Sequence, residues 1–566
     1  MDYIILALAL ALVVALLMLK EYLNNKKYRQ GMLEQLYEKY GQPSERAYKA
    51  EELSHIKFYY QKHEKEHQID DITWNDLNMD RIYQQMNTSC SAAGDEYLYY
   101  CLRTPEYDTG KLQQWEQQIT YFMEHEKERQ AVQKELFALG RSGKYSIYEY
   151  LDNLELLGER SCGKYLFFDL LFLVSIGIMF LSLPLGVVLF IAVACHNLVG
   201  YYKEHKMVEP YVTSFYYVQR VLECVEQILK IPLTEHEKEQ QSMQECYKKL
   251  KGFMRNSYLV IAAQRSTGNP LEILMDYLRM LFYLDLIQFN RTLASLRAHI
   301  GEVDEMITLL GKMETAIVIG SYRASLHNGW CVPDLTEDGG KDKQQLVLQD
   351  AYHPLLDNPV SNSIMVSGGV LLTGSNASGK STFLRTMGIC VLLAQTVHTV
   401  PAKEYAAPIF RIYSSMALKD DIISGDSYYM VEIKSIKRIL DKAKKAEQEN
   451  CKVLCFVDEV LRGTNTVERI AASTQILRTL ERSNVICFAA THDVELTKLL
   501  QDGYENYHFE ERIEQDDIFF PYQILAGPAT SRNAIALLNL LGYDKEIVTK
   551  AEEMAENFLK EGAWRK

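Results

Sequence analysis

The sequence lacks C-x-x-C pairs, an excess of positive charge and the low hydrophobicity of a disordered chain. Its eleven cysteines are odd in number and scattered, which excludes zinc-site spacing and a disulfide framework and predicts reduced cytosolic thiols. With 75 acidic and 61 basic residues the net charge is −14, so a protein that coats nucleic acid with its whole surface is excluded. At 48% hydrophobic and 24% charged residues the chain is globular, and its 566 residues predict three or four structural units.

Residues 3–19 form an uncharged apolar run, YIILALALALVVALLML. This run is close to the shortest helix that spans a bilayer core of about 30 Å. A cleaved signal peptide is the alternative, but basic residues follow the run instead of preceding it, and no small-residue cleavage site intervenes. We therefore expect an N-terminal anchor with its N-terminus outside the cell and the rest of the chain continuing in the cytoplasm.

A second apolar stretch, from Tyr165 to Val199, contains only Asp169 and His196 as ionisable groups and is too long for one span. The sequence Leu183-Pro-Leu-Gly186 interrupts it, and basic residues flank both of its ends. This pattern predicts two short transmembrane helices that cross the bilayer and return. A helical hairpin buried inside a soluble domain would have the same composition.

Apolar residues recur every three or four positions from Phe282 to Ile317, which predicts one long helix with a single apolar stripe. The stripe consists of Phe282, Leu286, Phe289, Leu293, Leu296, Ile300, Val303, Ile307, Leu310, Met313 and Ile317. Such a stripe is more often core packing than a binding surface, and we interpret the helix as a lever. From about residue 330, short apolar runs alternate with helical stretches, which is the α/β pattern.

One of these apolar runs, Val370 to Thr373, is followed by the sequence GSNASGKST at residues 374–382 and then by a helical stretch. The spacing G-x-x-x-x-G-K-[ST] between a strand and a helix is that of a phosphate-binding loop. Its glycines allow backbone N–H groups to surround phosphates, Lys380 can reach the outer phosphates, and the Ser381 hydroxyl can ligate Mg²⁺.

Two later apolar runs also end in polar residues. The run from Val453 to Val457 ends in Asp458-Glu459, which predicts that Asp458 holds Mg²⁺ through water and that Glu459 orients or deprotonates the attacking water. The run from Val485 to Ala490 ends in Thr491-His492, where a polar side chain can sense the γ-phosphate. A strand-end aspartate can also simply cap the next helix. Three such strand ends in this order favour a nucleotide-hydrolysing site.

These segments resemble those of the MutS family of ATPases, densely over residues 345–555. The matching segments are residues 373–382 (TGSNASGKST), 420–432 (DDIISGDSYYMVE), 458–465 (DEVLRGTN), 491–492 (TH), 400–402 (VPA), 353–354 (HP) and 522–527 (YQILAG) with Ser531. More weakly, Asp76-Leu77 and the stretch from Met86 to Pro105 are similar to the start of the MutS core domain, and the apolar stripe is similar to its lever helix.

The resemblance implies a homodimer with composite sites, in which Ser427 completes the active site of the opposite subunit. An ABC transporter ATPase is the nearest alternative. Its signature would be an L-S-G-G-Q-like helix start shortly before the second acidic strand, whereas here Ser424-Gly-Asp-Ser427 occupies a more MutS-like position. The expected catalytic residues are Lys380, Glu459 and His492, and the expected Mg²⁺ ligands are Ser381 and Asp458. The expected nucleotide-binding residues are Gly374, Ser375, Asn376, Ala377, Ser378, Gly379, Lys380, Ser381, Thr382 and, in trans, Ser427.

The sequence departs from mismatch-repair MutS at several points. The loop reads GSNASG where those proteins usually have GPNMGG, and Val460-Leu461 replaces the usual Ile-Gly. About fifty cytoplasmic residues precede the core, too few for mismatch-reading and connector domains, and no nuclease domain follows residue 566, so we do not expect mismatch recognition. The basic cluster from Lys248 to Arg255 is either a DNA contact or a solvated helix face.

The expected fold class is an α/β C-terminal P-loop ATPase domain of MutS/ABC type plus an all-α core and lever with transmembrane helices. The expected domains are an anchor (1–20), a helical linker (21–68), the first part of the core (69–164), a transmembrane hairpin (165–200), core and lever helices (201–330) and the ATPase domain with a C-terminal helical dimerisation segment (331–566). We expect a multi-pass protein of the cell membrane with cytoplasmic core and ATPase domains, using ATP and Mg²⁺. Its levers either clamp double-stranded DNA, as in the mismatch-repair-related family, or act on a membrane or protein partner without DNA.

Overall fold

The computed structural model describes residues 19–20, 23–24, 26–141, 146–158, 160–262, 277–336, 345–375, 378–416, 428–462, 464–514, 517–529, 535, 538 and 542–561. Several expected features lie outside these residues: residues 3–18 of the anchor, Asn376 and Ala377 of the phosphate loop, residues 420–427 with Ser424 and Ser427, Gly463, and Ser531. The chain divides into two compact units. The first comprises Met1–His63, Asn87–Tyr100 and Gln117–Ser325, and the second comprises Glu64–Met86, Cys101–Glu116 and Leu326–Lys566.

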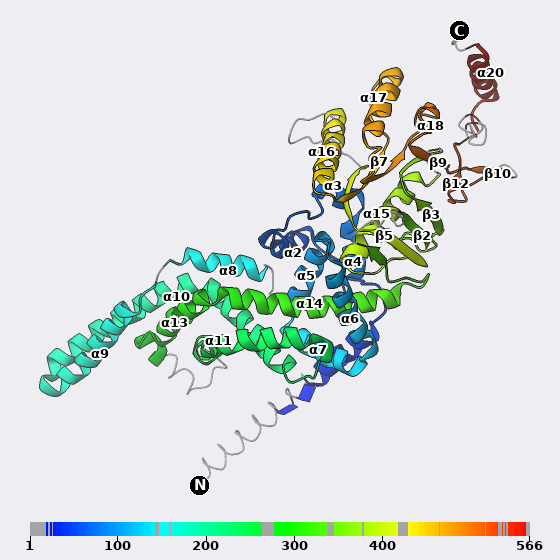
Figure 1. Ribbon diagram of the computed structural model, residues 1–566. Coiled ribbons are helices and arrows are strands. Elements are labelled where there is room, and N and C mark those ends of the chain that lie inside the picture. The colour runs from blue at the N-terminus through cyan, green and yellow to red at the C-terminus, as the bar shows by residue number, and fades with distance from the viewer. Residues whose placement is uncertain are drawn as a thin grey trace. The chain divides into compact units, whose positions relative to one another are not determined.

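The described part of the first unit is helical (Figure 1). Its helices include α2 (Ala50–Lys62), most of α5 (Ala92–Arg103), part of α6 (Thr109–Glu124), α7 (Glu126–Leu139), α8 (Ile147–Leu156), α9 (Gly163–Leu181), α10 (Leu183–Ile228), the 3₁₀ turn η1 (Thr234–His236), α11 (Glu237–Ala262), α13 (Leu284–Ala298) and α14 (Ile300–Ser325).

The apolar stripe lies on α13 and α14 and forms core, with residues such as Leu293, Val303 and Leu310 buried. The prediction of one long helix is wrong, because the stripe is divided between two helices at His299. His299 leaves helical geometry at φ −131° and ψ 27°, and its Nδ1 donates to the Ser295 carbonyl at 2.9 Å. This side-chain bond satisfies one of the carbonyls that the end of α13 leaves without a helical partner.

Helices α5 and α14 approach closely at two glycines. A Cβ on Gly311 would lie 2.6 Å from the Ala93 carbonyl oxygen, and a Cβ on Gly94 would lie 2.2 Å from Glu314 Oε2. Both distances are shorter than any that a real Cβ tolerates, so only glycine permits this packing.

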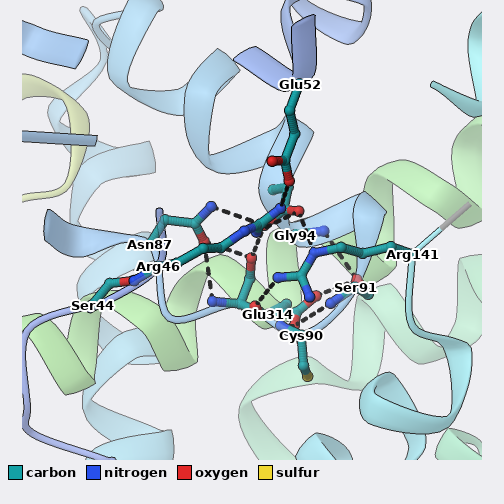
Figure 2. Close-up of polar contacts among 11 residues, drawn as sticks. Ser44, Arg46, Glu52, Asn87, Cys90, Ser91, Gly94, Arg141 and Glu314 are labelled. Carbon is teal, nitrogen blue, oxygen red and sulfur yellow. Dashed lines mark hydrogen bonds and ion pairs between the residues drawn. The ribbon is translucent and has the colours of Figure 1, made fainter. Parts of the chain in front are cut away.

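Figure 2 shows the buried polar network beside these glycines. Glu314 Oε1 accepts from the backbone N–H groups of Cys90 (2.6 Å) and Ser91 (3.1 Å), at the start of α5, and burial raises the pKa of this carboxyl group. Arg46 and Arg141 each lie 2.8 Å from the buried carboxylate of Asp95. A network whose buried groups are hydrogen-bonded favours a single arrangement of its helices.

The second apolar stretch forms α9 and the first half of α10, which turn back on each other at Ser182. The break was expected over Leu183-Pro-Leu-Gly186, but Pro184 lies in the first turn of α10, where its missing N–H would have no helical partner. A Cβ on Gly186 would lie 2.5 Å from the Met179 backbone, so glycine allows the close approach of α9 and α10 here. The second helix is not short, because α10 continues without interruption to Ile228.

Two helical segments, Gly163–Leu181 and Leu183–Val208, are long and apolar enough to cross a membrane by length and composition. Only 17% of each window is buried within the described chain. Most of their apolar side chains therefore face outward.

The second unit combines β-sheets with helices. Its strands are β1 (Asp334–Thr336), β2 (Leu346–Ala351), β3 (Asn362–Val366), β4 (Gly369–Thr373), β5 (Glu404–Pro408), β6 (Phe410–Ser415), β7 (Lys452–Asp458), β8 (Val485–Ala490), β9 (Tyr504–His508), β10 (Arg512–Glu514), β11 (Asp517–Phe519) and β12 (Leu525–Ala526). Its helices include α3 (Asp71–Asp76), α4 (Met79–Met86), α15 (Lys380–Thr396), α16 (Tyr428–Gln448), α17 (Thr466–Thr479), α18 (Glu495–Leu499) and α20 (Lys545–Glu561).

The six-stranded sheet has the order β12-β9-β4-β8-β7-β6, with β9, β4, β8, β7 and β6 parallel and β12 antiparallel at one edge. Leu372 and Asp458 both register with Ala490, so the carboxyl ends of β4, β7 and β8 meet at one edge of the sheet. The three strands expected from the sequence to bear the nucleotide site are thus neighbours in space.

The segment around Asp76-Leu77 is part of the second unit. Asp76 Oδ2 accepts from Ser414 Oγ at 2.6 Å, and the Asp76 carbonyl accepts from Arg385 Nε at 3.0 Å. A Cβ on Gly388 would lie 2.4 Å from Leu77 Cδ2. This segment therefore packs on α15, the helix that follows the phosphate loop.

Candidate active site

The phosphate loop connects β4 to α15, as its sequence predicts. Gly374 and Gly379 have φ values of 139° and 108°, which strongly favour glycine. A Cβ on Gly374 would lie 2.5 Å from the Phe509 carbonyl oxygen, so this position has no room for a side chain either. Between the two glycines, Ser378 Oγ donates to the Ser375 carbonyl at 2.8 Å and closes a turn.

Lys380 begins α15 and its side chain turns back over the loop. Its Nζ donates to the carbonyl oxygens of Gly374 (2.7 Å) and Ser375 (2.8 Å). Burial lowers the pKa of Lys380, although the nearby carboxylates of Asp458, Glu459 and Glu511 oppose this shift. A partly desolvated ammonium group at the start of a helix is suited to bind phosphate.

Ser381 and Asp458 form a pair of oxygen donors at the edge of the sheet. Ser381 Oγ donates to Asp458 Oδ2 at 2.5 Å. Burial raises the pKa of Asp458, and the Ser381 hydroxyl acts against this shift. A hydroxyl and a carboxylate are ligands that Mg²⁺ prefers, so these residues fit the cation expected with a nucleotide.

Glu459 lies beside this pair and is held at both carboxylate oxygens. Its Oε1 lies 2.8 Å from His492 Nε2, and its Oε2 lies 2.9 Å from Arg462 Nε. The hydrogen bond from His492 lowers the pKa of Glu459, and so does the charge of Arg462. Glu459 adopts a left-handed φ of 58°, and such strain in a non-glycine residue is typical of functional sites.

A cavity of about 450 Å³ opens beside the loop. It is lined by Gly379, Lys380, Ser381, Thr382 and Phe383 and by residues of other segments, including His353, Asn362, Phe509 and Tyr522. Asn362 joins two of these segments, because its Nδ2 donates to the Tyr522 carbonyl at 3.0 Å and its Oδ1 accepts from the Ile524 N–H at 2.7 Å. The cavity has the size and the mixed polar and apolar lining of a small-molecule site.

The structure brings together the described residues predicted for the site: Gly374, Ser375, Ser378, Gly379, Lys380, Ser381, Thr382, Asp458, Glu459 and His492. Thr491 Oγ1 accepts from the Asp493 N–H at 3.0 Å. Sequence reasoning missed Glu511, which accepts from Ser375 Oγ at 2.9 Å. It also missed the role of Arg462, although this residue was in a segment already singled out.

Comparison with known proteins finds related sequences for this part of the chain. A family model described as MutS domain V matches residues 370–559. Proteins named DNA mismatch repair protein MutS are similar to this chain: that of Pseudothermotoga lettingae is 30% identical over 47% of this chain and 33% of its own length. The protein of Thermus aquaticus is 35% identical over 38% of this chain and 26% of its own length. The protein of Clostridium kluyveri is 30% identical over 41% of this chain and 27% of its own length.

The matches therefore cover about a quarter to a third of the length of these relatives. The match to the family model includes the segment that carries the phosphate loop and the strand ends at the edge of the parallel sheet. Residues 370–559 therefore match the family model MutS domain V, and this part of the chain is similar to MutS proteins.

Proposed function

We propose that this chain is a membrane-anchored ATPase that binds and hydrolyses ATP at composite sites of a homodimer. The observation that carries the proposal is the convergence of Lys380, the Ser381–Asp458 pair and the Glu459–His492 pair at one edge of a parallel sheet. Ion pairs that only stabilise the fold do not require a buried lysine, a hydroxyl–carboxylate pair and a strained glutamate to lie together.

The roles follow from the positions of the groups. Lys380 and the loop N–H groups bind the β- and γ-phosphates, and the cavity beside α15 accommodates the rest of the nucleotide. Ser381 and Asp458 would hold Mg²⁺, which neutralises phosphate charge when it is bound. Glu459 is ionised, because its pKa is lowered, and it accepts a hydrogen bond or the proton of the attacking water. His492 keeps the Glu459 carboxylate oriented.

The test compares nucleotide binding with hydrolysis in the full-length protein in detergent micelles. Glu459→Gln should keep ATP affinity and lose turnover by about 10²-fold or more, because the residue acts on water and not on phosphate binding. Lys380→Ala should lose binding. Lys437→Ala is a matched control, because Lys437 is exposed and pairs with Asp441 on the surface of α16. Wild-type turnover in Glu459→Gln would contradict the proposal.

The proposal of membrane attachment rests on the two exposed apolar helical segments, Gly163–Leu181 and Leu183–Val208. A helical hairpin buried in a soluble domain would hide its apolar side chains, whereas here Leu181 is 89% exposed. Deletion of residues 1–20 should therefore leave the protein in the membrane fraction. Release of this variant into the soluble fraction would exclude the hairpin as a second anchor.

Double-stranded DNA is the proposed ligand of the core and lever, because the relatives are named as DNA mismatch repair proteins. The alternative is an ATPase whose levers act on a membrane or protein partner, which the net charge of −14 favours. The basic cluster lies on α11, where Lys249 pairs with Glu302 at 3.0 Å and Lys248 is exposed. Anisotropy of labelled duplex DNA between 50 and 200 mM salt decides between them: affinity that falls steeply with salt supports DNA, and no binding supports the alternative.

A further inference from the structure

The loop that follows Glu459 is tied to helix α16 by one buried carboxylate. Glu432, on the second turn of α16, is 3% exposed, and its Oε1 accepts from the Arg462 N–H at 3.3 Å. The side chain of the same Arg462 pairs with Glu459 Oε2. A continuous path of contacts therefore leads from α16 through Arg462 to the expected catalytic base.

Stability alone does not explain a carboxylate at position 432. Burial raises the pKa of Glu432, and its Oε2 has no hydrogen-bond partner within the described residues. A buried acidic group that is only partly hydrogen-bonded is often less favourable than an apolar side chain of the same size. Glu432 therefore costs folding free energy, and its contact with the active-site loop is what distinguishes it from an apolar residue.

We propose that Glu432 is a positioning residue for Glu459, acting through Arg462. Glu432 fixes the backbone at Arg462, and the guanidinium group then holds Glu459 Oε2 while His492 holds Oε1. This inference deepens the proposed ATPase function and depends on it.

The variants separate the hydrogen bond from packing. Glu432→Met keeps the side-chain volume and removes the acceptor, and Glu432→Gln keeps an acceptor without the charge. Arg462→Met removes the guanidinium group that contacts Glu459. Glu447→Gln is the matched control, because Glu447 lies on the same helix and its side chain is 48% exposed. Each variant is measured as full-length protein in detergent micelles, after its thermal unfolding profile has been compared with that of wild type.

We expect Glu432→Met to lower kcat for ATP about tenfold with KM unchanged within twofold, because a small displacement of the base affects the chemical step and not binding. Glu432→Gln should lose less than threefold. Arg462→Met removes the guanidinium group that holds Glu459 Oε2, so it should lower kcat at least as much as Glu432→Met, with KM again unchanged within twofold. A lower kcat at unchanged KM, in a Glu432→Met protein that unfolds at no lower temperature than wild type, is a result that a merely structural role would not produce.

The two positions form a double-variant cycle. If Glu432 acts through Arg462, the Glu432→Met/Arg462→Met protein should be no slower than Arg462→Met alone. If the losses of kcat in the two single variants multiply in the double variant, or if Glu432→Met has the wild-type kcat, the inference is overturned. Wild-type hydrolysis that is abolished by Glu459→Gln but unaffected by Glu432→Met leaves the ATPase proposal standing. Absence of hydrolysis in wild type would overturn both.

Discussion

Leu461 occupies a backbone conformation that suits glycine, and this gives a prediction with a definite sign. Its φ is 58°, in the left-handed region, at a position where the related mismatch-repair proteins usually have glycine. The side chain is only 6% exposed and belongs to a core cluster that includes Ile436 and Leu477. The left-handed conformation costs an L-residue about 1–2 kcal/mol, whereas burial of a leucine side chain contributes about 1.5–3 kcal/mol. Burial therefore offsets the strain.

The test compares alanine with glycine at two adjacent positions. At position 461 both substitutions remove the buried side chain, but only glycine relieves the strain, so Leu461→Gly should be about 1 kcal/mol more stable than Leu461→Ala. Val460 is equally buried and does not have a positive φ, so Val460→Gly should be about 0.5–1 kcal/mol less stable than Val460→Ala.

Thermal unfolding of the full-length protein in detergent measures both differences, with unfolding of the second unit detected by its susceptibility to proteolysis. For a unit of this size each kcal/mol corresponds to roughly 2–4 °C in Tm. Because the prediction is a reversal of order between neighbouring positions, it does not depend on the absolute cost of losing either side chain. The reasoning would be refuted if Leu461→Ala were as stable as Leu461→Gly, or if the glycine variant were the more stable one at both positions.

Three further predictions concern other parts of the chain. Burial lowers the pKa of His236 from 6.5 to about 4, so on acidification the unfolded chain takes up a proton at this residue at a higher pH than the folded chain does. The free energy of unfolding should therefore fall by up to about 3 kcal/mol between pH 6.5 and 4. Denaturant titrations of His236→Phe should show a weaker pH dependence. Gly186→Ala should lower Tm, whereas Gly177→Ala, which has free space around it, should not, and equal effects would contradict the tight helix approach. Co-expression of Ser427→Ala and Lys380→Ala chains should restore up to about half the wild-type rate per mixed dimer, and confirmed mixed dimers without rescue would contradict a trans role for Ser427.

The nucleotide loop and the two acidic residues were predictable because they depend on local chemistry. The backbone geometry of the loop requires glycine at positions 374 and 379, and the charge of a phosphate requires the lysine that follows. All three residues can be read directly from the sequence. The α/β pattern after residue 330 was predictable for the same reason, since buried parallel strands are short apolar runs.

The contacts missed from sequence are long-range ones. Glu511 meets Ser375 across 136 positions, and no spacing rule connects them. Arg462 and Glu432 lie in recognised segments, but their pairing depends on how α16 packs against the loop after β7. The division of the apolar stripe was missed because its 3–4 spacing continues through His299, and only the side-chain bond to Ser295 marks the end of α13.

Helix α10 joins the candidate membrane span directly to the rest of the first unit. It has 46 residues, which at 1.5 Å per residue makes a rod about 69 Å long, and Leu183–Val208 is the part that could cross a bilayer. If this part crosses a bilayer, a tilt of the span is transmitted along a continuous helix to the rest of the first unit, with no flexible linker between them.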